Sequence, residues 1–300
     1  MKSGNSKSVI GWLIFGILAS FIFAFVYTNY RVNKISSNGS LKSDSTLYSR
    51  VISSKEIRAG YYNGAPYFIK NPNNDSISGI FAEVLDSVGV NLGLKIKWVG
   101  EADFPTMATD LEAGKFDIIG SGIWISSERG KVADFSIPVL FDVVGAYVRA
   151  SDKRFDNNLS LINDPKIKIS TIDGEMASVI AKKDFPKADV FSLPQSSDFT
   201  LMLKNVVDKK ADVTFLGLGP ANTFISKNPG SLKPISLNAP VRVFPTSIMI
   251  KRNEYEFSRM LNLALMDLIN NGVVDKIIAK YETFPLSHYR VARPFRTTIN

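Results

Sequence analysis

The sequence predicts an α/β fold built as two lobes. Stretches with strand-like and helix-like apolar patterns alternate from about residue 55 onward, and two extended apolar segments, residues 143–152 and 243–253, interrupt them. Strands that alternate with helices at this spacing are typical of mainly parallel sheets. If the chain crosses to a second lobe at the first segment and returns at the second, the lobes enclose a cleft that hinge bending can close.

The individual elements follow from the spacing of apolar residues. In the segment 79–93, Phe81, Val84, Leu85 and Val88 recur at the spacing of one helix face. The predicted strands cover residues 55–62, 94–100, 116–123, 167–171, 188–193 and 211–218. The predicted helices cover residues 79–93, 104–113, 175–184 and 197–210, and two more present Phe257, Leu261, Leu265 and Leu268, then Val274, Ile277, Ile278 and Tyr281.

Composition excludes several classes of function. The chain has 300 residues, 45% of them hydrophobic, which is enough for two medium cores. It has no cysteine and one histidine, His288, so disulfides, thiolate chemistry, a histidine-based triad in the core and a standard zinc site are not expected. We therefore expect neither a metal nor a cofactor.

The net charge of +8 does not indicate a nucleic-acid partner. Residues 1–52 hold six basic residues and one acidic residue, so the other 248 residues carry only +3. The excess cations flank an apolar segment, as juxtamembrane cations do. No basic stripe interleaved with aromatic residues is present, and we expect no nucleic-acid binding.

The apolar segment is residues 9–27, "VIGWLIFGILASFIFAFVY", which holds no charge over 19 residues. A helix of that length spans about 28 Å, close to the ~30 Å hydrocarbon core of a bilayer. A cleavable signal peptide is the alternative, but the end of the run offers no small-residue cleavage site. The sequence predicts an uncleaved transmembrane anchor, with residues 1–8 in the cytoplasm and the Ser- and Asn-rich residues 28–52 as a flexible spacer.

Several motifs, taken in order, resemble a known family. They are "GYYNGAPYF" (60–68), "SGIFAEVLDSVGVNLGLKIKWV" (78–99), "FPTMATDLEAGKFDIIGSGIWISSERGKVADFSIPV" (104–139), "IDGEMAS" (172–178), "KKADVTFLGLGPA" (209–221) and "TSIMIKRNEYEFSRMLNLALMDLINNGVVDKIIAKY" (246–281). Over roughly residues 55 to 284 the chain is similar to the bacterial extracellular solute-binding proteins of the amino-acid-binding type.

The resemblance implies a two-lobed periplasmic-binding-protein fold of type II, with two hinge strands. Lobe one is expected to comprise residues 53–146 and 248–284, lobe two residues 147–247, and a C-terminal tail residues 285–300. The implied function is to close on a small carboxylate ligand, such as an amino acid, and deliver it to the permease of an ABC importer. The binding domain is expected to be a monomer on the periplasmic or extracellular side of the cell membrane.

The resemblance also implies a role for Arg129. The family's Thr-x-x-Arg motif is represented here by Ser126-Ser127-Glu128-Arg129, and its arginine typically holds the ligand's carboxylate. A guanidinium suits this task because it is always charged and offers parallel donors. The Ser126 hydroxyl and backbone amides near Gly122 are expected to assist. The alternative is a structural one, in which Ser126 caps a helix and Arg129 pairs with Asp134 on the surface.

Other positions depart from the family pattern. Tyr62 occupies the place of an acidic residue, Trp124 that of a small polar residue, and Gly217 that of the aspartate that receives a ligand's ammonium group. Candidate replacements for that acid are Glu83 and Glu175, the latter at a helix start after Gly174. For each glutamate the alternative is a solvated side chain favoured there by the helix dipole.

Aromatic residues are expected to line the cleft. Tyr61, Tyr62, Tyr67, Phe104 and Trp124 lie in stretches that border the cleft in the family, and they suit a flat or partly apolar ligand. The alternative is that about half of them are core residues.

Two other classes of function stay open. Some relatives of this fold are dehydratases that act on cyclohexadienyl acids, and Glu175 is the one candidate for their acid. The other is a ligand-sensing module that acts through a separate partner, because only eight residues precede the apolar segment. We expect a binding protein rather than an enzyme.

Overall fold

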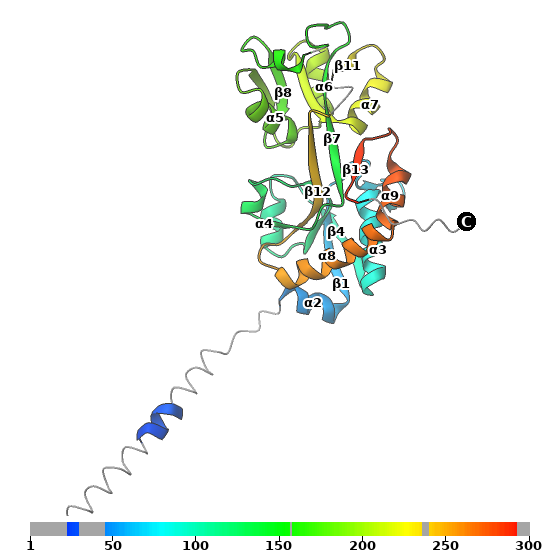
Figure 1. Cartoon of the computed structure of the whole chain (residues 1–300). Helices are drawn as coiled ribbons and strands as arrows, with labels where there is room; N and C mark the ends of the chain where they lie inside the picture. Colours follow the sequence, from blue (N-terminus) through cyan, green and yellow to red (C-terminus); the bar gives the residue numbers. More distant parts are fainter. Residues whose placement is uncertain (1–22, 30–45, 157, 236–239, 293–300) are drawn as a thin grey trace, which may run out of the picture. The chain divides into compact units, whose positions relative to one another are not determined.

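The computed structural model describes residues 23–29, 46–156, 158–235 and 240–292 (Figure 1). The chain divides into two compact units, Met1–Thr46 and Leu47–Asn300. In the first unit, residues 23–29 form a helix, and most of the predicted anchor, residues 9–22, lies outside the described residues. Within the described part of the chain, no helix is both long enough and apolar enough to cross a membrane.

The second unit contains one mixed sheet that runs through two lobes. Its strand order is β4-β1-β5-β12-β7-β10-β8-β9. Lobe one contributes β1 (Glu56–Tyr61), β4 (Lys95–Glu101) and β5 (Ile118–Trp124), and lobe two contributes β8 (Lys168–Ile172), β9 (Asp189–Leu193) and β10 (Val213–Gly217). Within each of these sets the paired strands are parallel, as the sequence predicts.

Two long antiparallel strands join the lobes. They are β7 (Leu140–Arg149) and β12 (Arg242–Ile250), which run side by side between the two halves of the unit (Figure 1). Short strands attach to them: β6 (Asp134–Phe135) to β12, and β11 (Leu232–Pro234) and β13 (His288–Arg290) to β7. A separate hairpin consists of β2 (Ile69–Lys70) and β3 (Ile77–Ser78).

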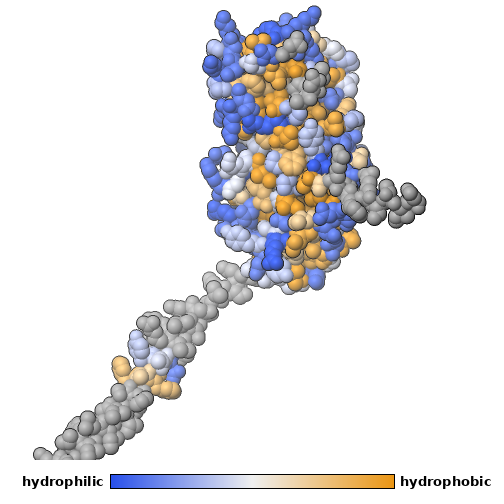
Figure 2. All heavy atoms as spheres, in the orientation of Figure 1, coloured by the Kyte–Doolittle hydropathy of each residue, from blue (hydrophilic) through white to orange (hydrophobic). Residues whose placement is uncertain are grey.

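Helices cover the sheet in both lobes. Lobe one has α2 (Leu47–Ser54), α3 (Ile80–Leu92), α4 (Met107–Glu112), α8 (Tyr255–Asn270), α9 (Val273–Tyr281) and the 3₁₀ turn η1 (Arg129–Lys131). Lobe two has α5 (Met176–Asp184), α6 (Thr200–Val207), α7 (Leu218–Lys227) and the 3₁₀ turn η2 (Leu159–Ile162). The apolar face predicted for 79–93 is the buried face of α3, which contacts α8 and α9. On the face drawn in Figure 2, apolar residues are visible on both lobes with polar residues around them.

The core clusters show where the chain changes lobe. Leu140 and Ile248 belong to the lobe-one core, whereas Val144 and Phe244 belong to the lobe-two core. The hinge on β7 therefore lies before residue 144, and residues 144–146, which the sequence assigns to lobe one, pack in lobe two. Asp142 and Thr246 stand at the crossing itself, as β7 and β12 pass from one core to the other.

Two segments differ from the sequence prediction. The spacer predicted for residues 28–52 ends earlier, because Leu47 and Val51, one turn apart on α2, are buried in the lobe-one core. In the tail, β13 pairs with β7, with His288 opposite Asp142. Both segments are ordered by contacts with distant parts of the chain.

Candidate functional site

The site is organised around an ion pair between the lobes. Arg129 begins η1 in lobe one, and its Nη2 lies 2.7 Å from Oε1 of Glu175, the residue that precedes α5 in lobe two. The Arg129 side chain is 13% exposed and that of Glu175 is 4% exposed. A charge pair this deeply withdrawn from water interacts strongly, but each ion also pays a large desolvation cost.

Trp124 completes the arrangement from the end of β5. Its Nε1–H donates to the second oxygen of Glu175 at 2.9 Å, and its carbonyl oxygen accepts from Arg129 Nη1 at 3.1 Å. The guanidinium carbon also lies 4.2 Å from the centroid of the indole ring, which is a cation–π contact. Although Trp124 belongs to a lobe-one strand, it packs in the lobe-two core against Phe244. The pair and the indole therefore hold the two lobes in contact.

Electrostatics at Glu175 combine opposing effects. Burial raises the pKa of the Glu175 carboxyl above its ordinary value, while the charge of Arg129 and the hydrogen bonds from Trp124 and Arg129 act to lower it. The net direction is upward because removal of a carboxylate from water is costly. Glu175 is thus a buried acid whose charge depends on Arg129.

Local backbone geometry determines where the side chains of Arg129 and Glu175 lie. The Ser126 hydroxyl accepts from the backbone N–H of Arg129 at 3.2 Å and so holds the start of the turn, although the residue that precedes η1 is Glu128. The surface pair between Arg129 and Asp134 is not formed, because Arg129 turns to Glu175 and Asp134 accepts from the backbone N–H of Asn253. Gly174 has φ +74°, a left-handed conformation that suits glycine and lets the chain turn from β8 into α5.

Aromatic residues lie beside the ion pair. The Tyr62 and Phe104 rings are 4.6 Å apart edge to face, and Phe104 meets Phe199 of lobe two at 6.4 Å. Arg129 lies 5.8 Å from the Phe104 ring centroid. Burial, and then the negative charges of Asp198, Glu175 and Glu101, raise the pKa of the Tyr62 hydroxyl, so it remains a neutral hydrogen-bonding group.

Three of the predicted site residues have other partners. Glu83 lies on α3 and accepts hydrogen bonds from Lys280 and Tyr281 of α9. Burial acts to raise the pKa of the Glu83 carboxyl, but these hydrogen bonds lower it overall. Tyr67 donates to Asp142 at 2.5 Å. Gly122 has φ +79°, and a Cβ there would lie 2.5 Å from the Phe81 ring, so its glycine is explained by helix packing rather than by an anion nest. Glu83 and Tyr67 therefore have partners within the protein, and a ligand-binding role for either residue stays a prediction.

Sequence reasoning missed two residues near the site. Ser121 accepts from the backbone N–H of Tyr62 at 2.7 Å and thereby fixes the loop that carries it. Phe199 precedes α6 and reaches Phe104 from the other lobe. The short polar segment 194–198 before a helix was a signal for such a loop, but nothing in it indicated the contact.

Gly217 caps α7 without a carboxylate, and Asp212 pairs with Arg149 and Arg154.

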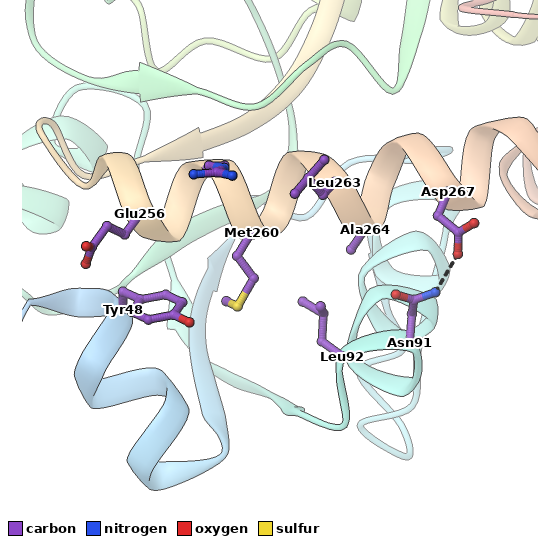
Figure 3. A pocket seen from close by; sticks show the side chains of 9 residues that line it. Tyr48, Asn91, Leu92, Glu256, Met260, Leu263, Ala264 and Asp267 are labelled. Atoms are coloured by element: carbon purple, nitrogen blue, oxygen red, sulfur yellow. Dashed lines mark hydrogen bonds between the residues drawn. The ribbon is translucent and has the colours of Figure 1, made fainter.

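A groove lies elsewhere on lobe one. A groove of about 640 Å³ runs along α8 between α2 and the end of α3, with Tyr48, Leu92, Met260 and Leu263 on its walls (Figure 3). Asn91 donates to Asp267 at one end of the groove, at 2.8 Å. No predicted site residue lines it. Among the described residues, no group of three or more His, Asp or Glu side chains is placed to hold a metal ion.

Comparison with known proteins gives the family. The chain is 25% identical over 176 residues to the cyclohexadienyl dehydratase of Pseudomonas aeruginosa, over 59% of this chain and 64% of the dehydratase, so it spans just under two thirds of that enzyme. It is 22% identical over 239 residues to the L-arginine-binding protein of the same organism, over 77% of this chain and 89% of that protein.

Among solved structures, it is similar to an ancestral amino acid-binding protein described as a precursor of cyclohexadienyl dehydratase. The TM-score is 0.65 at 21% identity, over 79% of this chain and 99% of the other. Residues 57–284 match a family profile. The chain belongs to the bacterial extracellular solute-binding proteins, family 3.

Proposed function

We propose that this protein binds an amino acid in the cleft between its lobes. The observation that carries the proposal is the Arg129–Glu175 pair, one charge from each lobe at 2.7 Å. An amino acid presents the two complementary charges, so its carboxylate replaces Glu175 at Arg129 and its ammonium group pairs with Glu175. Without a ligand the two side chains satisfy each other.

This arrangement makes Glu175 the substitute for the acid that Gly217 lacks. Arg129 suits a carboxylate because its planar fork donates two parallel hydrogen bonds. Trp124, Tyr62 and Phe104 supply aromatic surface for the ligand's side chain. Similarity to an L-arginine-binding protein supports L-arginine and related cationic amino acids as the first ligands to test.

A screen of amino acids by thermal shift tests the proposal. At least one L-amino acid should raise the melting temperature in a concentration-dependent way, because a ligand that binds only the folded state stabilises it. The Arg129→Ala variant should lose the response. If the full set of L-amino acids leaves the wild-type melting temperature unchanged, the proposed ligand class is wrong.

Delivery to an ABC permease and anchoring by residues 9–27 belong to the same proposal. The uncharged run of 19 residues supports the anchor, and membership of an extracellular solute-binding family supports delivery to a permease. The protein would then act as a monomer on the outer side of the cell membrane. Fractionation should recover the full-length chain with membranes, and a soluble exported form that begins after residue 27 would contradict the anchor.

A second candidate function is a dehydratase that acts on a cyclohexadienyl acid. Burial raises the pKa of Glu175, and a protonated carboxyl can give the proton that a departing hydroxyl group needs. Similarity to a cyclohexadienyl dehydratase supports this candidate. Incubation with cyclohexadienyl acids, followed by ultraviolet absorbance, would reveal an aromatic product. If no aromatic product forms, the dehydratase candidate is wrong and amino-acid binding is the remaining proposal.

A further inference from the structure

A buried polar cluster stands at the hinge. Asp142 of β7, 4% exposed, accepts from the Tyr67 hydroxyl at 2.5 Å, from the Thr246 hydroxyl at 2.5 Å and from His288 Nδ1 at 3.0 Å. Burial and the Asp142 carboxylate raise the pKa of Tyr67 well above its ordinary value, so this hydroxyl keeps its proton and donates. Asp142 is thus a carboxylate with three donors, one from each strand or loop around it.

This cluster fixes the imidazole of His288. Because Asp142 accepts at Nδ1, that nitrogen carries a hydrogen, and Nε2 is the free end of the ring. Within the described residues, Nε2 makes no hydrogen bond, although the His288 side chain is only 3% exposed. Nε2 is not one of the fully buried side-chain atoms, so it is accessible from the space beside the ring and can take a partner there.

His288 lines a cavity between the lobes. The cavity has a volume of about 350 Å³, which is within the range of small-molecule sites. One wall is α7 of lobe two, and the other is formed by the end of α9 and the loop that leads to β13. None of its lining residues belongs to the Arg129 cleft. His288 and Ser287 lie beyond residues 57–284, so the family match does not cover this wall.

The cavity has apolar walls and one available cation. Pro66, Pro220, Phe224 and Phe284 supply apolar surface, and Lys227 of α7 lines the same space. Lys227 makes no ion pair within the described chain. The acid beside it is already engaged, since Glu282 accepts from the backbone N–H of His288 at 3.1 Å and from Arg290 at 2.9 Å.

We propose that this cavity is a second binding site, for a small carboxylate with an apolar body, held by Lys227 and by Nε2 of His288. The apolar walls take the body of the ligand, and Lys227 supplies the opposite charge. To donate to a carboxylate, Nε2 takes up a proton, and the imidazolium then lies between two anions, Asp142 and the ligand. The Tyr67 ring lies edge to face with the His288 ring, whereas Glu282 and Arg290 contact the His288 backbone, and all three have partners. The site does not depend on which ligand the Arg129 cleft takes.

The single histidine of the chain makes the test direct. Full-length protein labelled with ¹⁵N in the imidazole is titrated with sodium benzoate, and the ring nitrogens are followed by NMR. Without benzoate, the spectrum should show hydrogen on Nδ1. Benzoate should shift the Nε2 signal saturably, whereas benzamide, of the same shape without the charge, should bind at least about tenfold more weakly, the effect of losing about 1.4 kcal/mol.

Matched variants identify the site. Lys227→Gln should weaken benzoate binding about tenfold or more, and Lys204→Gln, on the neighbouring helix α6, should not change it. Arg129→Ala should leave the benzoate response intact, which separates this site from the cleft. The proposal is overturned if benzoate gives no saturable shift, if Lys227→Gln responds like the wild type, or if Arg129→Ala abolishes the shift.

Discussion

Arg129 has a protein carboxylate as its partner, so the proposed ligand binding at this site is an exchange of partners. The pair joins the two lobes, and each member also contacts Trp124. A ligand must therefore separate two charges and satisfy both. This favours a molecule that carries both signs of charge over a simple anion, because a simple anion would leave Glu175 buried and unpaired.

The Arg129→Ala variant tests how strongly the pair is coupled. Removal of the guanidinium leaves the Glu175 carboxylate, 4% exposed, without its opposite charge. We expect the free energy of unfolding at neutral pH to fall by roughly 3 kcal/mol. The double variant Arg129→Ala with Glu175→Gln should recover a large part of that loss in denaturant titrations. Additive losses would show that the two side chains are not coupled.

The raised pKa of Glu175 predicts a dependence of stability on pH. A carboxyl whose pKa is higher in the folded than in the unfolded state stabilises the folded state fully below the unfolded pKa. That contribution is lost as pH rises from the unfolded value through the folded one. The free energy of unfolding of the wild type, minus that of Glu175→Gln, should therefore fall as pH rises from 4 to 7. A difference that rises over this interval would mean that the folded pKa is depressed.

At the residue scale, the sequence singled out two residues that the structure joins in an ion pair. Arg129 and Glu175 were recognisable because each stands at the start of a turn or helix, in the family-like motifs 104–139 and 172–178. Their contact with each other was not predictable, since it joins residues 46 positions apart in different lobes. The same limit applies to Tyr67 and Glu83. Their partners, Asp142 and Tyr281, are brought near by strand register and helix packing that no local pattern encodes.

At the scale of elements, β5 shows how glycines position the site. The Cβ of an alanine at Gly120 would lie 2.5 Å from Leu85, and one at Gly122 would lie 2.5 Å from Phe81. Both contacts are with α3, which therefore packs directly on the β5 backbone. The same strand ends at Trp124, so the packing of α3 fixes the height at which the indole and the Arg129 turn enter the cleft.

Gly122→Ala should be strongly destabilising. The residue has φ +79°, which costs about 1 to 2 kcal/mol for a residue with a Cβ, and the Phe81 ring has no space to move because it is fully buried. We expect a loss of at least about 2 kcal/mol in chemical denaturation. Gly100→Ala on β4 is the matched control, since nothing lies within 4 Å of its Cβ. If both variants unfold alike, close packing of α3 is not the reason for the glycine.

Elements with strong apolar periodicity were predictable, and elements that depend on distant contacts were not. Helix α3 and strand β4 lie within one residue of the ranges predicted for them. Helix α2 was hidden in a polar segment because only Leu47 and Val51 mark its buried face. Strand β13 is three residues long and exists because β7 offers it an edge at Phe141. Short elements of this kind carry too few residues for a pattern.

At the scale of the whole molecule, two hinge strands and one continuous sheet explain how the lobes remain together yet separable. The strands β7 and β12 change from one core to the other at Asp142 and Thr246, whose side chains are hydrogen-bonded to each other. Contacts between the lobes include the Arg129–Glu175 pair, the hydrogen bond from Trp124 to Glu175, and the ring contact of Phe104 with Phe199. A ligand that engages both charges is therefore expected to hold the lobes closed.

The most direct test is calorimetric titration with a matched set of ligands. The amino acid that gives the strongest thermal shift is compared with its analogue that lacks the amino group and its analogue that lacks the carboxylate. If the cleft holds a zwitterion between Arg129 and Glu175, each analogue should bind at least about a hundredfold more weakly, because each leaves one buried charge unpaired. In Glu175→Gln, the advantage of the amino acid over the analogue without an amino group should disappear. Equal binding of the amino acid and that analogue by the wild type would contradict the assignment of Glu175.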